Sequence, residues 1–398
     1  MSRHPVLYQW QAVVGKRLPQ LSKPMAACLA LWSFGMIIAR SCSLTAVAWT
    51  LAPILTLQFF TVRERLRDLY REGSAKAGDR RRTLDLSLCW APWLNWVLRA
   101  WSRPQLAVAL DATSLGQRFV VLAISVLYRG SAVPVAWKIL RATAKHPWNP
   151  EWQTLLQQLQ HVVPAGWKVI ALADRGLYSK ELYQAIQSVG WHPLLRVNGQ
   201  GYFRPGGWYH WRQLGKLVQR PGQRWQGRAT VFKNAPGQLQ CTLLASWEEG
   251  HKEPWLVLTD LGPQAADVCW YGLRAWIEHG FQETKSSGWQ WQHTRMTDPE
   301  RAERLWLAIA LATWWLLSVG GEADSEVATE TLGAVPYTEG SRRPRWRLVA
   351  VFRSGWTLIM AALINHKRLP LGTGNPEPWP IMLLPPSTPQ RRRKNLQL

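Results

Sequence analysis

The sequence predicts an α/β fold, and three features of the chain support this prediction. Its 398 residues are 47% hydrophobic, which is enough for a sizeable core. Three short apolar segments rich in β-branched residues follow one another, with glycine-containing turns between them. Amphipathic helical patterns then alternate with further apolar segments, an order typical of an α/β core. Strands are expected at residues 106–110, 119–128, 132–140, 167–173 and 193–197, and helices at residues 151–163 and 179–189.

The third of these strands is predicted to lie at a sheet edge or at a bulge, because it contains Pro134 and proline cannot donate a ladder hydrogen bond. Beyond the fifth strand the composition shifts to Gly, Pro, Trp, Gln and Arg with short alternating runs. Residues 198–260 are therefore predicted to form a β-rich insertion. Residues 255–259 (WLVLT) are either its last strand or lead back to the core. The insertion divides the core into residues 101–197 and 261–320.

The N-terminal flank, residues 1–100, shows no strong strand alternation and is predicted to be a mostly helical DNA-binding region. Within it, residues 61–72 place apolar side chains on one face and four arginines elsewhere. This helix either lies against DNA phosphates or is an ordinary solvated helix. The linker that follows adds three further arginines at residues 80–82.

The C-terminal side is predicted to begin with a long helix that ends near Val319. Asp298 is a favourable N-cap for this helix, and Pro299 suits its first position. The basic region that follows, residues 321–398, is expected to contribute to dimerisation or DNA contacts. Its expected parts are an acidic loop at 321–340, a helix at about 356–365 and a disordered tail at 385–398.

The charge of the chain indicates a polyanionic partner. The formal net charge is +23, and it is concentrated at both ends. Residues 1–100 have 14 basic and 5 acidic residues, and residues 341–398 have 11 and 1. Residues 101–340 are nearly balanced, with 23 and 19. This distribution suits an enzyme whose nearly neutral core is flanked by basic segments that bind DNA. Basic tails can also be present only to keep a protein soluble.

The sequence predicts a cytoplasmic protein that does not cross a membrane. The five cysteines include no C-x-x-C pair, which argues against a zinc site and a disulfide framework, and the N-terminus has no cleavable signal pattern. The apolar stretch at 25–60 is interrupted by Arg40 and Pro53. The stretch at 305–319 is only 15 residues long, shorter than the roughly 20 that a spanning helix needs. Both are predicted to be buried helices.

The most informative pattern is a cluster of four chemically distinct residues late in the core. Tyr271, Arg274 and Glu278 are spaced so that an α-helix places them on one face, with Lys285 two turns further along. A carboxylate flanked by two cations and a phenol suits a metal held beside a phosphate. One carboxylate is too few for two-metal phosphoryl transfer, which needs acidic ligands from different elements.

Two aspartates are placed to supply these ligands. Asp111 follows the apolar run of the first predicted strand, in LAVALDATS, and Asp174 follows the fourth, in VIALADRGLYS. A polar turn is expected after each, so both carboxylates should lie at the mouth of the sheet. An aspartate at a strand end often only caps the next helix, but two of them together with Glu278 favour a catalytic site.

Asp111, Asp174 and Glu278 resemble the DDE triad of ribonuclease H-like transposases and integrases. Tyr271, Arg274, Glu278 and Lys285, here called the YREK residues, match the spacing Y-x2-R-x3-E-x6-K without deviation. This is the signature of the YREK transposases of bacterial insertion sequences, the insertion-sequence-four family. The resemblance covers about residues 106–320, and a β-rich insertion between the second Asp and the Glu is also a feature of that family.

The resemblance implies a ribonuclease H-like, retroviral-integrase-like catalytic core and cut-and-paste DNA transposition. The three carboxylates would bind two Mg²⁺ ions, for which Mn²⁺ may substitute, and the ions would activate water and then the released 3′-OH. In this family that hydroxyl typically forms a hairpin on the opposite strand before transfer to target DNA. Arg274 and Lys285 would steady phosphates, and Tyr271 would donate to one. The implied partners are double-stranded DNA and a second subunit in a paired-end complex, with the protein nucleoid-associated in a bacterium.

Trp255 is the candidate for stacking on a base flipped out of the DNA end. It begins a predicted strand that resembles the one carrying such a tryptophan in relatives, and base–aromatic stacking contributes roughly 1–3 kcal/mol. The chain has 27 tryptophans, and any one of them more often serves packing. Trp289 and Trp291 are weaker candidates, and Trp314 and Trp315 are predicted to lie in the core. Arg175 and Tyr178 are placed either for DNA contact or for structure, and His279 is given no ligand role.

Three other interpretations remain open from the sequence. A related ribonuclease H-like metal-dependent nuclease would use the same carboxylates without joining strands. An inactive, domesticated DNA-binding derivative would retain the fold alone. A membrane protein built on the two apolar stretches would leave the carboxylates unexplained.

Overall fold

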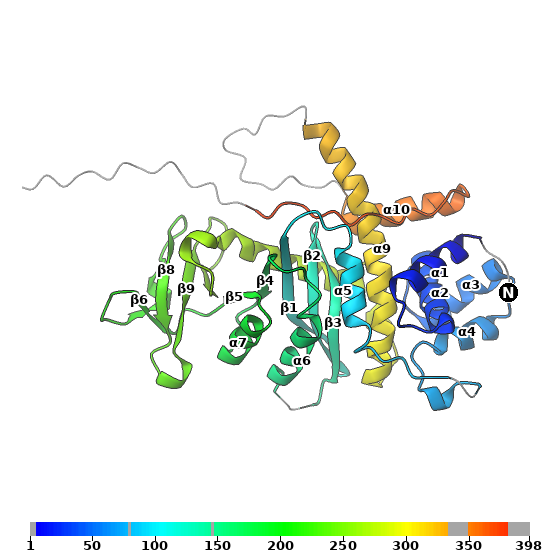
Figure 1. Cartoon of the computed structure of the whole chain (residues 1–398), viewed down its shortest axis with the longest axis horizontal. Coiled ribbons are helices and arrows are strands. Elements are labelled where there is room, and N and C mark those ends of the chain that lie inside the picture. The colour runs from blue at the N-terminus through cyan, green and yellow to red at the C-terminus, as the bar shows by residue number, and fades with distance from the viewer. Residues whose placement is uncertain (1–4, 79–80, 145–146, 333–348, 381–398) are drawn as a thin grey trace, which may run out of the picture.

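A ten-stranded mixed sheet forms the centre of the molecule, and a bundle of helices packs at one end of it (Figure 1). This architecture is taken from a computed structural model, which describes residues 5–78, 81–144, 147–332 and 349–380. It confirms the predicted mixed α/β class. The strands are β1 (Gln105–Leu115), β2 (Phe119–Tyr128), β3 (Ser131–Arg141), β4 (Lys168–Ala173), β5 (His192–Arg196), β6 (Tyr202–Pro205), β7 (Arg212–Gln213), β8 (Arg224–Val231), β9 (Leu239–Ser246) and β10 (Trp255–Thr259).

The α-helices lie before, between and after these strands. They are α1 (Pro5–Arg17), α2 (Lys23–Ala39), α3 (Leu44–Leu55), α4 (Phe59–Arg67), α5 (Trp90–Leu98), α6 (Asn149–Leu159), α7 (Lys180–Ser188), α8 (Ala275–Thr284), α9 (Pro299–Leu332) and α10 (Val351–Ile364). A 3₁₀ helix, η5 (Val268–Arg274), leads directly into α8.

The first five strands occupy one half of the sheet in the order β3-β2-β1-β4-β5. β1, β2 and β3 form an antiparallel meander, whereas β4 is parallel to β1 and β5 is parallel to β4. β3 is the edge strand, and its register with β2 shifts beside Pro134. The predicted effect of this proline is therefore confirmed.

The segment after β5 extends the same sheet. β10 pairs with β5 on one side and with β9 on the other, and β8, β6 and β7 continue outwards to the far edge. β10 is thus both the last strand of the segment and its return to the core. The sequence could not indicate this, because the β10–β5 pairing joins Val257 to Arg196 across the whole intervening segment.

The two apolar stretches are buried helices. α2 and α3 contribute fully buried side chains, and α9 packs against α2, α10 and β3. Residues 299–325 of α9 are long and apolar enough to cross a membrane, but 94% of their most apolar window is buried inside the protein. In α4 the predicted apolar face is buried, with Val62 and Leu66 fully covered.

Two C-terminal boundaries differ from those predicted. α9 continues to Leu332 instead of ending near Val319, and residues 321–332 are helical where a loop was expected. Arg129, beside the β2–β3 turn, holds this extension through an ion pair with Asp324 (2.7 Å). α10 begins at Val351, earlier than predicted. It crosses α9 closely, since a Cβ atom at Gly355 would collide with the Leu316 carbonyl. The predicted disordered tail at 385–398 lies outside the described residues.

Candidate active site

Asp111 and Asp174 lie side by side where the parallel pairing of β1 with β4 ends. Leu110 of β1 pairs with Ala173 of β4, so the two aspartates occupy the next position of the same register. Strands in a sheet are about 4.8 Å apart, which places the two backbones close together. Asp111 does not end its strand, as the sequence had suggested, because β1 continues to Leu115 in pairing with β2 alone.

The YREK residues do not share one α-helix, which corrects a second expectation. Tyr271 and Arg274 belong to the 3₁₀ helix η5, Glu278 to α8, and Lys285 is the residue that caps α8. Tyr271, Arg274 and Glu278 still share one face, as predicted. Residues three apart are aligned on a 3₁₀ helix, and residues four apart are neighbours on an α-helix. Asp267 starts η5 by accepting a hydrogen bond from the Cys269 amide (2.8 Å).

Arg274 joins two of the three predicted carboxylates. One terminal nitrogen of its guanidinium lies 3.0 Å from Asp111 Oδ2, and the other lies 2.9 Å from Glu278 Oε1. The Arg274 side chain is 14% exposed, so this fork is partly shielded from water. Burial raises the pKa of the Asp111 carboxyl, and the nearby charge of Asp174 contributes in the same direction.

Asp174 is held by two other groups at the same sheet edge. The Tyr271 hydroxyl donates to Asp174 Oδ1 (3.4 Å), and a guanidinium nitrogen of Arg196 lies 4.0 Å from the same oxygen. Arg196 ends β5 and also pairs with Glu253 (2.7 Å), which in turn pairs with Arg175 (3.0 Å). Sequence reasoning missed Arg196 and Glu253. The available signal was that Arg196 lies near the end of the strand predicted at residues 193–197.

Lys285 reaches the same part of the sheet from the end of α8. Its ammonium donates to Thr113 Oγ1 (2.8 Å) and to the Ser114 carbonyl (2.9 Å), both on the outer half of β1. Burial lowers the pKa of this lysine. The ammonium therefore lies against β1, the strand that carries Asp111, where it could bind an anion at the same edge of the sheet.

The tryptophans considered as base-stacking candidates differ in how far they are buried. Trp255 is half-buried at the start of β10 and meets the Tyr271 ring edge to face, with ring centres 5.3 Å apart. Trp289 and Trp291 are fully buried, so neither is available to stack on a DNA base, and that expectation was wrong. Trp314 and Trp315 are in the core, as predicted.

The remaining candidates have structural partners. Tyr178 packs against Phe232, and Arg175 takes part in the Glu253 pair described above. His279 Nδ1 lies 2.8 Å from the Gly130 carbonyl oxygen, to which it can donate a hydrogen bond. The five cysteines are free thiols.

The oxygen donors at this edge fit a hard divalent cation in their chemistry. Within the described part of the chain, no three His, Cys, Asp or Glu side chains already surround a point where a metal could bind. Instead, the Arg274 guanidinium occupies the position between Asp111 and Glu278 where a cation is favourable. Carboxylates are the ligands that Mg²⁺ prefers, so Asp111, Asp174 and Glu278 would hold the ion once Arg274 moves away.

α8 also has a buried acid on the face that packs against the sheet. Glu283 accepts a hydrogen bond from the Ser131 hydroxyl (2.6 Å), and burial raises its pKa from 4.5 to about 8. Gly280, one turn earlier, lies against the backbone of Ala132 in β3 and leaves no room for a Cβ atom. These contacts set the position of α8, and therefore that of Glu278.

We expect Glu283→Gln to change the pH dependence of stability. Because the folded-state pKa lies above the unfolded value, the folded protein binds the extra proton, and wild-type stability falls as pH rises from about 4.5 to about 8. The amide that replaces the carboxyl group does not titrate. The free energy of unfolding of the variant, relative to that of wild type, should therefore rise by roughly 2–5 kcal/mol over this interval. Urea unfolding at both ends of the interval measures this gain.

The matched control is Glu181→Gln on α7, where the carboxylate is exposed. It should leave the pH profile of unfolding unchanged. Parallel profiles for wild type and Glu283→Gln would contradict the assignment of Glu283 as a neutral buried acid.

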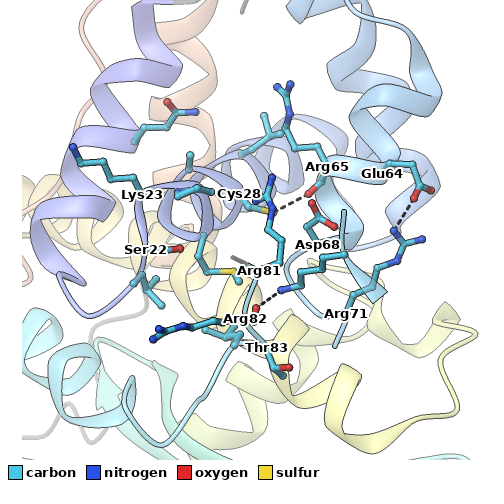
Figure 2. A pocket seen from close by; sticks show the side chains of 18 of the residues that line it. Ser22, Lys23, Cys28, Glu64, Arg65, Asp68, Arg71, Arg81, Arg82 and Thr83 are labelled. Carbon is cyan, nitrogen blue, oxygen red and sulfur yellow. Dashed lines mark hydrogen bonds and ion pairs between the residues drawn. The ribbon is translucent and has the colours of Figure 1, made fainter. Parts of the chain in front are cut away.

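A separate cavity of about 1480 Å³ lies in the helical N-terminal region, between α1, α2, α4 and the linker before α5 (Figure 2). Arg65 of α4, Asp68 directly after α4, and Arg81 and Arg82 of the linker face it (Figure 2). Its basic lining residues outnumber the acidic ones. The basic set is Lys23, Arg65, Arg71, Lys76, Arg81 and Arg82, and the acidic set is Glu64, Asp68 and Asp85.

Residues 104–315 match the family described as the transposase DDE domain. The match spans more than half of the chain and includes both aspartates and all the YREK residues, so the chain belongs to this family. Members are enzymes that cleave and transfer DNA strands, and they generally use divalent metal ions. Among solved structures, the chain is similar to a piggyBac transposase synaptic complex with hairpin DNA, seen by cryo-EM. The two are 12% identical with a TM-score of 0.39, over 89% of this chain and 77% of that chain. No curated protein matches the chain.

Proposed function

We propose that this protein is a YREK transposase of the insertion-sequence-four family with a ribonuclease H-like core. It cuts an insertion sequence at its terminal inverted repeats and joins the 3′-OH ends to target DNA. The observation that carries this proposal is that Asp111 and Asp174 lie at neighbouring positions of β1 and β4, and that Arg274 links Asp111 to Glu278 at the same sheet edge. The strand order β3-β2-β1-β4-β5, with a meander followed by two parallel strands, supports the ribonuclease H-like core.

Asp111, Asp174 and Glu278 would hold two Mg²⁺ ions, for which Mn²⁺ may substitute. Bound there, the ions would supply Lewis-acid polarisation of the scissile phosphate and a nucleophile at neutral pH. Arg274 leaves the carboxylates and binds a phosphate oxygen, because its fork matches phosphate as well as carboxylate. Lys285 binds a second phosphate beside β1. The Tyr271 hydroxyl donates a hydrogen bond to a phosphate on the side of Asp174. Fixed cations stabilise the charge on the transferring phosphoryl group without a covalent enzyme intermediate.

The proposed partners are double-stranded DNA, as transposon ends and as target, and a second copy of the chain in a paired-end complex. The basic cavity of the helical region supports a role of residues 1–100 in holding DNA, since Arg65, Arg81 and Arg82 face one concave surface. We place the protein in the bacterial cytoplasm, associated with the nucleoid.

We expect Trp255→Ala to block the hairpin step more than the first nick. Trp255 contacts Tyr271 at the active edge, so its ring is in place to hold a base flipped from the DNA end. Loss of one stacking contact of roughly 1–3 kcal/mol lowers hairpin formation by about 5- to 100-fold. Denaturing gels of end-labelled DNA resolve hairpins from nicked strands.

Trp255→Phe should restore part of the hairpin yield, because it retains an aromatic face. Gln157→Ala, which changes an exposed side chain on α6, is the control and should change neither product. Equal losses of nick and hairpin in Trp255→Ala would show a structural role instead.

A strand-transfer assay tests the proposed function as a whole. The substrate is DNA with the inverted repeats found on either side of the coding sequence, together with a supercoiled target and Mg²⁺. We expect cleaved ends and joined products. Cleavage without any joined product would favour a nuclease of related fold, and binding without cleavage would favour an inactive derivative.

A further inference from the structure

The outer end of the sheet carries a hairpin whose tip is unusually rich in exposed aromatic side chains. β6 and β7 pair at Phe203 and Arg212, and residues 206–211 form the loop between them. At this tip Trp208 is 52% exposed and Tyr209 is 90% exposed. The hairpin projects from the end of the sheet opposite the helical bundle (Figure 1). Large aromatic rings held in water at a tip indicate a surface that binds a partner.

The tip is positioned by a rigid base. Phe203 is buried and meets Trp225 of β8 edge to face, with ring centres 5.7 Å apart. The Gly206 amide donates to the Arg228 carbonyl (2.9 Å), which fixes the start of the loop to β8. Little conformational entropy is therefore lost when the exposed rings bind a partner.

Each arginine of the hairpin lies over a tryptophan of the same hairpin. The Arg212 guanidinium carbon is 4.4 Å from the centre of the Trp208 ring, and that of Arg204 is 5.1 Å from the Trp211 ring. Among the described residues, neither arginine forms an ion pair with a carboxylate. The guanidinium groups thus keep their charge available beside flat aromatic surfaces.

The charge of the surrounding segment identifies the chemistry of the partner. Residues 182–247 contain eight lysines and arginines and no aspartate or glutamate. This segment forms most of the outer half of the sheet, from β5 to β9. Two of these arginines pair with glutamates that follow the segment, Arg196 with Glu253 and Arg224 with Glu248. A surface on which cations outnumber acids and rings are exposed complements a polyanion that also has flat apolar faces, which describes a nucleic acid with accessible bases.

The distance between the β6–β7 hairpin and the strand that carries Asp111 can be compared with the length of one turn of DNA. In the sheet order, β7 lies seven strands from β1. At about 4.8 Å per strand, this is roughly 34 Å from the strand that carries Asp111. One turn of B-DNA is also about 34 Å, or ten base pairs. A duplex lying along the sheet therefore meets the tip about one turn away from the phosphate at the carboxylates.

We propose that the β6–β7 hairpin is a second DNA-binding site, in which Trp208 and Tyr209 stack on unpaired bases and Arg204 and Arg212 bind the adjoining phosphates. The site lies about one helical turn from the site of strand cleavage. This inference rests on the proposed function, because it takes the bound DNA to be the one that the carboxylates cut. It assigns the hairpin to DNA with opened or distorted base pairs, since rings stack only on bases whose faces are accessible.

Fluorescence anisotropy with the full chain tests the site without requiring catalysis. The probe is a labelled duplex of about 30 base pairs, either fully paired or with a short mismatch bubble about ten base pairs from one end. Wild type should bind the bubble more tightly than the paired duplex. In Trp208→Ala/Tyr209→Ala we expect bubble affinity to fall at least about tenfold and paired-duplex affinity to change less than about twofold.

The arginines and a matched control give independent readouts. Arg204→Ala/Arg212→Ala should weaken binding to both DNAs and reduce the slope of log affinity against log salt by about two. Gln157→Ala changes an exposed side chain on α6, outside the segments assigned to DNA, and should bind both DNAs like wild type. Asp111→Asn should also bind like wild type, so that loss of cleavage and loss of this site are distinguishable.

Two results would overturn the proposal. The first is unchanged preference for the bubble in Trp208→Ala/Tyr209→Ala, with the fold verified by thermal unfolding. The second is unchanged DNA binding in that variant together with lost binding to anionic phospholipid vesicles, which would assign the hairpin to a membrane surface.

Discussion

Replacing Asp111, Asp174 or Glu278 by alanine is expected to lower cleavage of transposon-end DNA by at least about a thousandfold. Each carboxylate is a proposed ligand of the catalytic ions, and several kcal/mol of transition-state stabilisation depend on those ions. DNA binding should remain close to that of wild type, because phosphates are held by cations elsewhere on the protein. Cleavage is measured on end-labelled DNA with Mg²⁺, and binding by gel shift in Ca²⁺.

The matched control is Asp260→Ala. Asp260 directly follows β10, at the opposite end of that strand from Trp255, and interacts with His192 (3.0 Å). Cleavage by this variant should equal that of wild type. Mg²⁺-dependent cleavage that persists in Asp111→Ala, Asp174→Ala or Glu278→Ala would remove that residue from the ligand set.

Removing the guanidinium of Arg274 is expected to have opposite effects on catalysis and on metal affinity. In Arg274→Ala, cleavage should fall at least about a hundredfold, because the cation that steadies the transferring phosphate is lost. Affinity for Mg²⁺ should rise, since the guanidinium no longer competes for Asp111 and Glu278. Without metal, the variant should lose about 1–3 kcal/mol of stability, mainly because the partly buried Asp111 carboxylate loses its partner, since the exposed Glu278 pair is screened by water.

Thermal unfolding over a series of Mg²⁺ concentrations measures both the lost stability and the metal affinity. The shift in melting temperature produced by Mg²⁺ should be larger in Arg274→Ala than in wild type. Arg274→Lys is the comparison, because it keeps the charge but cannot span two carboxylates as a fork. An equal Mg²⁺ response in wild type and Arg274→Ala would show that Arg274 does not occupy the metal position.

Sequence reasoning located the strands of the core because each is a short, continuous apolar run. It could place Asp111 and Asp174 at the mouth of the sheet because each follows an apolar run and precedes a polar turn, and the register of Leu110 with Ala173 places them at neighbouring positions. It could not predict that β1 continues beyond Asp111. That extension depends on pairing with β2 alone, which apolar pattern does not encode.

The details around the YREK residues depend on contacts that are distant in the chain. A 3₁₀ turn and an α-turn give similar spacings, so the sequence could not separate η5 from α8. Arg196 reaches Glu253 across 57 residues, and Arg129 reaches Asp324 across 195. No local pattern in the sequence indicates such pairs. The first places Arg196 beside Asp174, and the second connects the end of β2 to the C-terminal part of α9.

The β6–β7 hairpin at the outer edge of the sheet also could not be identified as a binding site from the sequence. Trp208 and Tyr209 are two aromatic residues in a chain that contains 27 tryptophans, most of which pack internally. Only their exposure and their place at the end of the sheet distinguish them from core residues.

The central claim is that Asp111, Asp174 and Glu278 hold the metal ions used for strand cleavage. Asp111→Cys tests it most directly, because a thiolate binds Mg²⁺ poorly and the softer Mn²⁺ better. We expect Asp111→Cys to be inactive with Mg²⁺ and to regain cleavage with Mn²⁺, while wild type is active with both ions and Asp111→Ala with neither. Equal cleavage by Asp111→Ala and wild type in Mg²⁺ would contradict the claim.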